Sequence, residues 1–243
     1  MLENEYLIRK MFRPGIIGAI INPFYIAREG LYNAIKGKAS EMTGKLLDIG
    51  CGNKPYEDLF TNISSYSGLE ITSTVHKSTK ADFFYDGTVF PFENDSFDSI
   101  LLNQVFEHVF NPDEFLKEVF RILKPGGKLL ISVPFVWDEH EQPYDYARYS
   151  SFGLKSIFLK SGFVVVSSLK TSPNFAAIFQ LINCYFYKIT YKLPMIFRML
   201  IVIVLCFPIN LLAIIFRNIL PDNDDLFLDN IMLFKKPLSP HNI

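Results

Sequence analysis

The sequence predicts an α/β fold with a doubly wound, mostly parallel sheet of seven strands, one of them antiparallel. Short apolar stretches that end in polar turns alternate with stretches of helical periodicity, which is the pattern of strand–helix–strand units. One apolar stretch ends in a Gly-x-Gly turn at Gly50 and Gly52. Glu70 follows Gly50 by about 20 positions, at the end of the next expected strand, and this spacing is typical of a nucleotide-binding sheet.

The Gly-x-Gly turn is the most informative feature of the chain. Residues 46–49 form the expected strand before it and include Asp48. Because glycine has no Cβ atom, Gly50 and Gly52 let the backbone take unusual angles and let a ligand lie against the main chain. The third glycine of the dinucleotide-binding pattern is missing, and Pro55 stands in its place. The turn therefore favours a nucleotide-like cofactor without phosphate groups.

The elements after the turn follow at regular intervals. Asn111, Pro112 and Glu114 have the order of a helix N-terminus, and apolar residues then recur with helical period up to Leu123. Residues 124–127 are expected to end this helix. Strands are expected over 66–70, 96–103, 128–134, 163–167 and 229–234, and a further helix over 150–162.

Together these motifs resemble those of the class I S-adenosylmethionine-dependent methyltransferases. The resemblance covers residues 44 to about 172. Its motifs are the turn at 46–52, Glu70, Asp86 before 90–92, residues 97–98 leading into 107–109, and residues 123–127. It implies a Rossmann-like fold, S-adenosyl-L-methionine as the cofactor and methyl transfer as the activity. This cofactor carries no phosphate, which agrees with the form of the Gly-x-Gly turn.

The resemblance also implies a cofactor site. Asp48, Gly50 and Gly52 line the amino-acid tail, Glu70 accepts from the ribose, Asp86 accepts from the adenine amino group, and Asn103 and Gln104 lie under the methionine part. Two alternatives remain open: Asp86 could cap its own turn, and Glu70 could be a solvated strand end. His108 is expected to be a structural residue.

A second candidate site follows the strand expected over 128–134. Residues 138–149 gather ionisable and aromatic side chains around one proline, at the edge of an α/β sheet where ligands bind. His140 is the first candidate for a general base because its unperturbed pKa lies near neutrality. Asp145 is the second candidate, as a base or as the group that orients the imidazole, and Arg148 would bind an anionic acceptor. The alternative is a charged, solvated loop.

The same run resembles a subgroup of bacterial methyltransferases associated with surface-glycan and lipid-linked saccharide pathways. That resemblance implies a small-molecule or lipid-linked saccharide as the acceptor, methylated on oxygen, with nitrogen and carbon left open. The 243 residues carry a formal net charge of −1, so no overall field attracts nucleic acid. The three cysteines are scattered, and none has a histidine at metal-ligand spacing. A cytoplasmic protein without a metal is therefore expected.

Four segments are expected: an N-terminal helical cap (1–43), the cofactor-binding core (44–172), an apolar helical insertion (173–226) and a closing strand with a tail (227–243). Residues 199–216 are uncharged and long enough to be a transmembrane candidate. A single span is disfavoured, because the strands on both sides of the insertion are expected in one sheet. Peripheral contact through residues 174–226, at the cytoplasmic face of the membrane, is the favoured interpretation. The alternative is a soluble lid on the core or on a second subunit, and the oligomeric state stays open.

Two other functions compete with methyl transfer. A nicotinamide-dependent oxidoreductase could use a similar sheet, but Pro55 in the turn and the closing antiparallel strand disfavour it. A non-catalytic, membrane-associated scaffold could keep the fold without turnover, but the complete set of cofactor-site residues disfavours that function.

Overall fold

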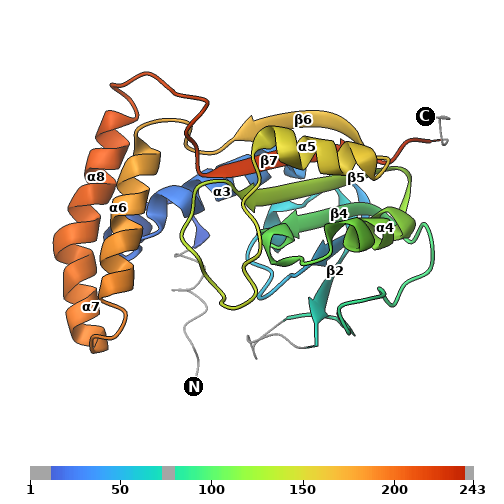
Figure 1. Ribbon diagram of the computed structural model, residues 1–243, viewed down its shortest axis with the longest axis horizontal. Coiled ribbons are helices and arrows are strands. Elements are labelled where there is room, and N and C mark those ends of the chain that lie inside the picture. Colours follow the sequence, from blue (N-terminus) through green and yellow to red (C-terminus); the bar gives the residue numbers. More distant parts are fainter. Residues whose placement is uncertain (1–11, 73–79, 239–243) are drawn as a thin grey trace. The chain divides into compact units, whose positions relative to one another are not determined.

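The computed structural model describes residues 12–72 and 80–238 (Figure 1). The first eleven positions of the predicted N-terminal cap lie outside this range. Two compact units emerge from the contacts within the chain. One consists of residues 1–34, 136–138 and 170–229, and the other of residues 35–135, 139–169 and 230–243. They are called the helical unit and the sheet unit below.

The sheet has seven strands in the order β3-β2-β1-β4-β5-β7-β6. The strands are β1 (Gly44–Ile49), β2 (Ile63–Ile71), β3 (Phe83–Tyr85), β4 (Phe97–Asn103), β5 (Leu123–Pro134), β6 (Val164–Lys170) and β7 (Asp229–Lys235). The pairs β1–β2, β1–β4, β2–β3 and β4–β5 are parallel. The predicted fold class is confirmed, since the sheet is mixed, mostly parallel and accompanied by helices.

The strand order changes direction between β1 and β4, which lie side by side. In an open α/β sheet, the crevice at the carboxyl ends of two such strands is where ligands bind. The central strands are buried on both faces, so they consist of nearly continuous apolar residues such as Leu46, Leu47 and Ile100. Packing of this core fixes the ends of β1 and β4, and therefore the site.

The helices and turns of the sheet unit differ from the sequence prediction in two details. Helix α4 (Pro112–Ile122) starts at its proline as predicted, but the side chain of Asn111 forms no capping hydrogen bond. Residues 124–127 lie past the end of the helix as predicted, but strand β5 starts directly after α4, five residues before the start expected at residue 128. Helix α5 (Ser151–Lys160) is capped by Ser150, whose Oγ accepts the Gly153 N–H at 3.2 Å. Single turns lie at η1 (Glu57–Leu59) and η2 (Phe106–His108).

The helical unit contains the N-terminal helices and the apolar insertion. Its elements are α2 (Ile16–Ile21), the first part of α3 (Tyr25–Ala39), α6 (Ala176–Ile189), α7 (Met195–Ile201), the π-helical turn η3 (Val202–Cys206) and α8 (Phe207–Phe216). Helices α6 and α8 lie side by side (Figure 1). Buried alanines at the contacts, including Ala19, Ala177 and Ala213, allow the helices to approach closely.

One helical stretch, Met195–Phe216, is long and apolar enough to cross a membrane, judged by length and composition over the residues that the structure describes. Core helices of soluble proteins can meet the same criteria, but they are mostly buried. Here only 22% of the apolar window is buried. Strands β6 and β7 are neighbours in the sheet. The chain therefore enters and leaves the insertion at adjacent strands, as the sequence analysis assumed.

Candidate active site

The turn after β1 requires glycine at Gly50 for a reason that the sequence did not reveal. Its φ is +70°, in the left-handed region that favours glycine. A Cβ atom at this position would lie 2.4 Å from Cγ2 of Val105, which follows β4. Its N–H donates to the carbonyl of Leu69 at 2.8 Å, which ties the turn to β2. Gly50 is thus needed for packing of the protein itself.

Gly52 has the opposite surroundings. It also has a positive φ of +47°, but a Cβ atom there would meet no other atom within 4 Å. Its N–H donates to Oε2 of Glu70 at 3.1 Å. Open space over a backbone with this geometry leaves room for a ligand to lie against the main chain, which is the role expected for the turn.

Glu70 and Asp48 are both buried acids at the carboxyl ends of strands. Glu70 is only 8% exposed, so it is not a solvated strand end, and that alternative is removed. Asp48 is 4% exposed and accepts a hydrogen bond from the Tyr66 hydroxyl at 2.6 Å. Burial raises the pKa of Asp48 to about 7, and the negative charge of Glu70 adds to the effect, while the Tyr66 hydrogen bond opposes it. The site therefore holds acids that would be stabilised by a cationic group, such as the ammonium of an amino-acid tail.

Asp86 is exposed and holds its own turn together. Its Oδ1 accepts from the Thr88 N–H at 2.9 Å and from the Thr88 hydroxyl at 2.6 Å. The hydrogen bonds from Thr88 lower the pKa of Asp86. This is the capping geometry that the sequence analysis left open as an alternative, and the adenine role of Asp86 stays a prediction.

Asn103 and Gln104 lie where β4 ends, next to β5. The Ser132 hydroxyl donates to Oδ1 of Asn103 at 2.7 Å, and the Gln104 N–H donates to the Ser132 carbonyl at 3.0 Å. Gln104 has a positive φ of +56°. These bonds fix the end of β4 against β5, and a contact of either amide with the cofactor stays a prediction.

His140, Asp145 and Arg148 form one cluster, as the sequence analysis expected. Arg148 donates from both terminal nitrogens to the Asp145 carboxylate, at 2.5 and 2.6 Å. Nδ1 of His140 lies 3.3 Å from Oδ2 of Asp145, and the His140 N–H donates to the same oxygen at 2.9 Å. The residues expected to act together in this loop are therefore brought together, all within the sheet unit.

The electrostatics of this cluster assign different roles to its two candidate bases. Burial raises the pKa of Asp145, but the hydrogen bonds from Arg148 and the His140 N–H, with the charges of both residues, outweigh burial and lower it to about 2. Such a carboxylate is a poor proton acceptor, so of the two roles predicted for Asp145 its electrostatics fit the orientation of the imidazole, and that role stays a prediction. Both terminal nitrogens of Arg148 donate to Asp145, so this carboxylate is the main partner of Arg148. Binding of an anionic acceptor by Arg148 stays a prediction.

Glu107 and His108 also belong to this region, although the sequence predicted a structural role for His108 and no role in the site for Glu107. The His108 and His140 rings are edge to face, with centroids 4.9 Å apart. Nε2 of His108 lies 3.8 Å from Oε1 of Glu107, which is fully buried. The adjacent Glu and His directly after β4, at the ligand-binding edge of the sheet, were the available signal.

Comparison with known proteins identifies the family of this chain. The sequence model of a family described as a methyltransferase domain matches residues 25–168, which is more than half of the chain. Relatives include phosphoethanolamine N-methyltransferase 2 of Caenorhabditis elegans, 28% identical over 38% of this chain and 23% of its own length. Demethylmenaquinone methyltransferase of Renibacterium salmoninarum is 28% identical over 36% of this chain and 40% of its own. The ubiquinone biosynthesis O-methyltransferase of Maricaulis maris is 32% identical over 35% and 39%.

The chain thus matches less than half of the length of these relatives. Solved structures share the fold. The [4+2]-cyclase SpnF superposes with a TM-score of 0.56 at 17% identity, over 88% of this chain and 84% of its own. A putative methyltransferase, solved in complex with the Haloferax volcanii Trm112 methyltransferase activator, gives a TM-score of 0.54 at 18% identity, over 98% and 97%. With the family match and the Gly-x-Gly turn at the β1–β4 crevice, the chain belongs to the class I S-adenosylmethionine-dependent methyltransferases.

Proposed function

We propose that this protein transfers the methyl group of S-adenosyl-L-methionine to a hydroxyl oxygen of a saccharide or lipid-linked saccharide. The observation that carries the proposal is the arrangement of His140, Asp145 and Arg148. In a methyltransferase domain, an imidazole oriented by a buried carboxylate follows β5 in the same unit as the cofactor turn. A hydroxyl acceptor needs such a base, because it must lose its proton as it attacks.

The chemistry that the chain must supply is limited. The sulfonium is already a good leaving group, so the protein mainly holds the acceptor oxygen, the methyl carbon and the sulfur in line, which can account for several kcal/mol of the barrier. His140 would accept the acceptor proton at Nε2, because its Nδ1 faces Asp145 at 3.3 Å. Arg148 keeps the Asp145 carboxylate ionised and in place through two hydrogen bonds.

The acceptor class is tested directly by product analysis. The names of the relatives refer to both N- and O-methylation, so family membership leaves the acceptor atom open. We would incubate the protein with isotopically labelled cofactor and extracted glycolipids, and identify labelled species by mass. Label on a saccharide oxygen is expected, and its loss in His140→Ala, with cofactor affinity retained, would support the role of the imidazole. Label on another lipid class alone would replace the saccharide in the proposal.

We also propose that the protein works at the cytoplasmic face of a membrane, with the α7–α8 stretch as the contact. Large apolar side chains on this stretch are exposed, and they include Met195 (75%), Ile196 (80%), Phe197 (58%), Leu200 (57%) and Val204 (57%). Contiguous exposed apolar surface of this kind is typical of membrane or protein contacts. Of the basic residues nearby, Lys192 is exposed, whereas Arg198 packs over the Tyr187 and Tyr191 rings and Arg217 pairs with Glu29.

Cofactor binding separates methyl transfer from its competitors. Calorimetric titration with S-adenosyl-L-methionine and, separately, with a reduced nicotinamide cofactor should give binding of the first alone. Binding of the nicotinamide cofactor alone would favour the oxidoreductase. Binding of S-adenosyl-L-methionine without turnover on any extracted lipid or glycan would favour the non-catalytic scaffold.

A further inference from the structure

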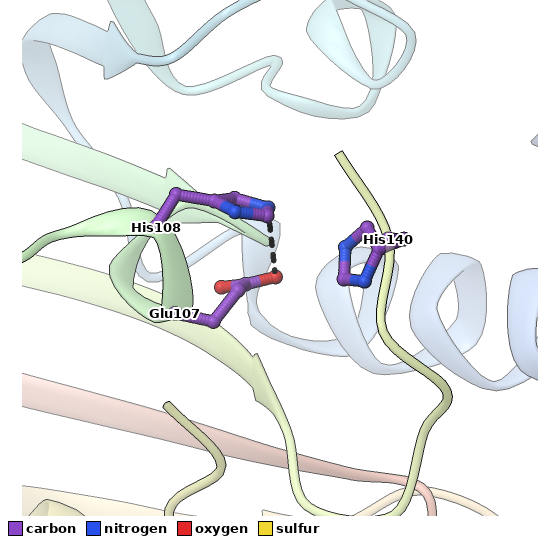
Figure 2. Close-up of side chains that lie close together, drawn as sticks. All are labelled: Glu107, His108 and His140. Atoms are coloured by element: carbon purple, nitrogen blue, oxygen red, sulfur yellow. Dashed lines mark ion pairs between the residues drawn. The ribbon is translucent and has the colours of Figure 1, made fainter. Parts of the chain in front are cut away.

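Three side chains with metal-binding donor atoms meet beside the expected acceptor site. Figure 2 shows Glu107 and His108, both from the turn η2, facing His140 from the loop after β5. One donor atom from each residue can be chosen so that all three atoms lie within 4.8 Å of one another. Glu107 is fully buried, whereas the side chains of His108 and His140 are 17% and 25% exposed. A buried carboxylate below two imidazoles that reach solvent is a site open on one side.

Backbone hydrogen bonds hold the two segments together independently of these side chains. The N–H groups of Tyr146 and Ala147 both donate to the Glu107 carbonyl, at 2.9 and 3.2 Å. The rings of Phe110 and Tyr146 add an edge-to-face contact with centroids 5.1 Å apart. The loop therefore keeps its place against η2 through main-chain contacts, so the donor atoms are brought together by the fold.

The second ring nitrogen of each histidine already has a neighbour that suits a metal ligand. Nδ1 of His108 lies 2.9 Å from the Tyr144 carbonyl. Since a carbonyl oxygen only accepts, Nδ1 carries the proton and Nε2 keeps its lone pair. Nδ1 of His140 lies 3.3 Å from the Asp145 carboxylate. Arg148 lies at 3.4 Å from the same nitrogen, but it donates to Asp145 at a much shorter 2.6 Å. Metal-ligating histidines usually donate their other N–H to a carbonyl or carboxylate in this way.

We propose that Glu107, His108 and His140 bind a divalent transition-metal ion of the Zn²⁺ type. Two imidazoles and a carboxylate match the ligands of open zinc sites, which keep a further position for water or substrate. Imidazole nitrogen favours Zn²⁺ and similar ions over Mg²⁺ and Ca²⁺, which prefer oxygen ligands. Tetrahedral bonding would place the donor atoms about 3.3–3.5 Å apart. The donor atoms lie within 4.8 Å of one another, so they would have to approach by up to about 1.5 Å to reach this geometry.

The position of the ion gives it a use that rests on the proposed function. An acceptor hydroxyl in the open position would be held beside the loop, and a bound cation makes such a group easier to deprotonate. With the ion present, Nε2 of His140 would be a ligand, so the acceptor proton would pass to solvent water on the side where His108 and His140 are exposed. The metal site and the imidazole base are thus separable by experiment.

Zinc binding by the full-length protein is the direct test. Protein freed of metal by chelation is titrated calorimetrically with Zn²⁺, and Co²⁺ is added separately to record the visible spectrum of the bound ion. We expect one ion per chain. Glu107→Gln and His140→Gln should each weaken Zn²⁺ binding by at least about 100-fold, since even changes around the ligands cost 10- to 100-fold. Glu139→Gln makes the same chemical change on an exposed side chain of the same loop, and it should bind Zn²⁺ as the wild type does.

Each outcome has a separate meaning. The proposal fails if the wild type binds no stoichiometric Zn²⁺, or if both ligand variants bind Zn²⁺ as tightly as Glu139→Gln does. His140→Gln guards against a folding defect, because its side chain is partly exposed, and circular dichroism checks that each variant is folded. Zinc binding without methyl transfer would leave the site standing while the proposed function fails. Methyl transfer by wild-type protein that binds no Zn²⁺ would leave the proposed function standing while the metal site fails.

Discussion

Two glycines only two positions apart have separate tasks, and substitution should reveal them. Gly50→Ala would place a Cβ atom 2.4 Å from Val105 at a positive φ, so we expect a loss of about 2–4 kcal/mol in the free energy of unfolding. Gly52→Ala places its Cβ in open space, so its stability loss should be about 1 kcal/mol, from the positive φ alone. Its affinity for S-adenosyl-L-methionine should nevertheless fall. Urea unfolding and calorimetric titration of both variants measure the two effects, and equal cofactor affinity in Gly52→Ala and the wild type would contradict the assignment.

Asp48 links stability to pH. Its pKa of about 7 in the folded protein lies above the ordinary value of 3.8, so the folded state binds this proton more tightly. The resulting stabilisation is fully present below roughly pH 4 and is lost as the pH rises through 7. Asp48→Asn cannot ionise, and its amide oxygen can still accept from Tyr66. Relative to this variant, the wild type should lose up to about 4 kcal/mol between roughly pH 4 and pH 8.

The same substitution should weaken cofactor binding, because it removes a carboxylate expected near the cationic amino-acid tail. Urea unfolding across this pH range, with titration of the cofactor at pH 8, measures both effects. A variant with the same pH profile as the wild type would show that another group titrates. Stability and cofactor binding thus make opposite demands on this residue, which is common at functional sites.

Glu70 is the clearest test of the cofactor assignment. It is buried and accepts the Gly52 N–H, whereas Asp86 is exposed and engaged with Thr88. Glu70→Gln should weaken S-adenosyl-L-methionine binding by about ten- to a hundred-fold, as expected when a charge-assisted hydrogen bond is lost. Asp86→Asn, which can still cap its turn, should have the smaller effect. The reverse order of the two affinities, measured by calorimetry, would move the ribose role away from Glu70.

The sequence was sufficient to predict those parts of the site whose residues are close together in the chain. A strand that ends in Gly50 and Gly52, with Glu70 at the end of the next strand, is readable because strand ends and turn residues are neighbours in the chain. The partner of Gly50 was not readable, because Val105 lies 55 positions later in the chain, after the end of β4. His108 and His140 meet only through the path of a loop held by backbone bonds to Glu107, and no periodicity encodes that path.

At the scale of elements, buried amides join the helices of the helical unit. Asn183 of α6 donates to Asn210 of α8 at 2.8 Å, and Asn210 donates to the carbonyls of Ala19 and Asn22 at 2.9 and 3.0 Å. Gln180 donates to the Pro23 carbonyl at 2.9 Å. Gln180 and Asn210 thus connect α6 and α8 to the N-terminal segment inside the helical unit.

Asn210→Leu should therefore destabilise the protein although it makes α8 more apolar. The change removes buried hydrogen bonds to the two carbonyls and to the Asn183 amide, although the Asn22 carbonyl still accepts from the Tyr25 N–H and the Asn183 amide still donates to the Cys206 carbonyl. We expect a total loss of about 1–3 kcal/mol in urea unfolding. Ile215→Ala serves as the control, because this side chain is 42% exposed on the same helix and its truncation should have a much smaller effect. Unchanged stability of Asn210→Leu would contradict the role of the network.

At the scale of the molecule, the family match and the insertion occupy different parts of the chain. The match ends at residue 168, before the apolar stretch begins. The family match thus covers most of the sheet unit. Methyl transfer does not require exposed apolar side chains such as Ile196 and Leu200, which lie outside the match. The sequence indicated this division through composition alone, but it could not show which apolar residues pack inside the unit, since that depends on how the helices pair.

The proposed membrane contact predicts how the whole protein partitions. Wild-type protein should sediment with anionic liposomes, whereas combined replacement of Leu200, Ile203 and Val204 by Ser should release it, because these exposed side chains (57%, 45% and 57%) would contact lipid. Each replacement removes on the order of 1–2 kcal/mol of favourable transfer, so binding should fall about 100-fold or more. Phe152→Ser is the matched control, since Phe152 is 82% exposed but lies on α5 of the sheet unit. Wild-type protein that stays in solution as a monomer in the presence of liposomes would rule out the contact and leave the insertion as a soluble lid.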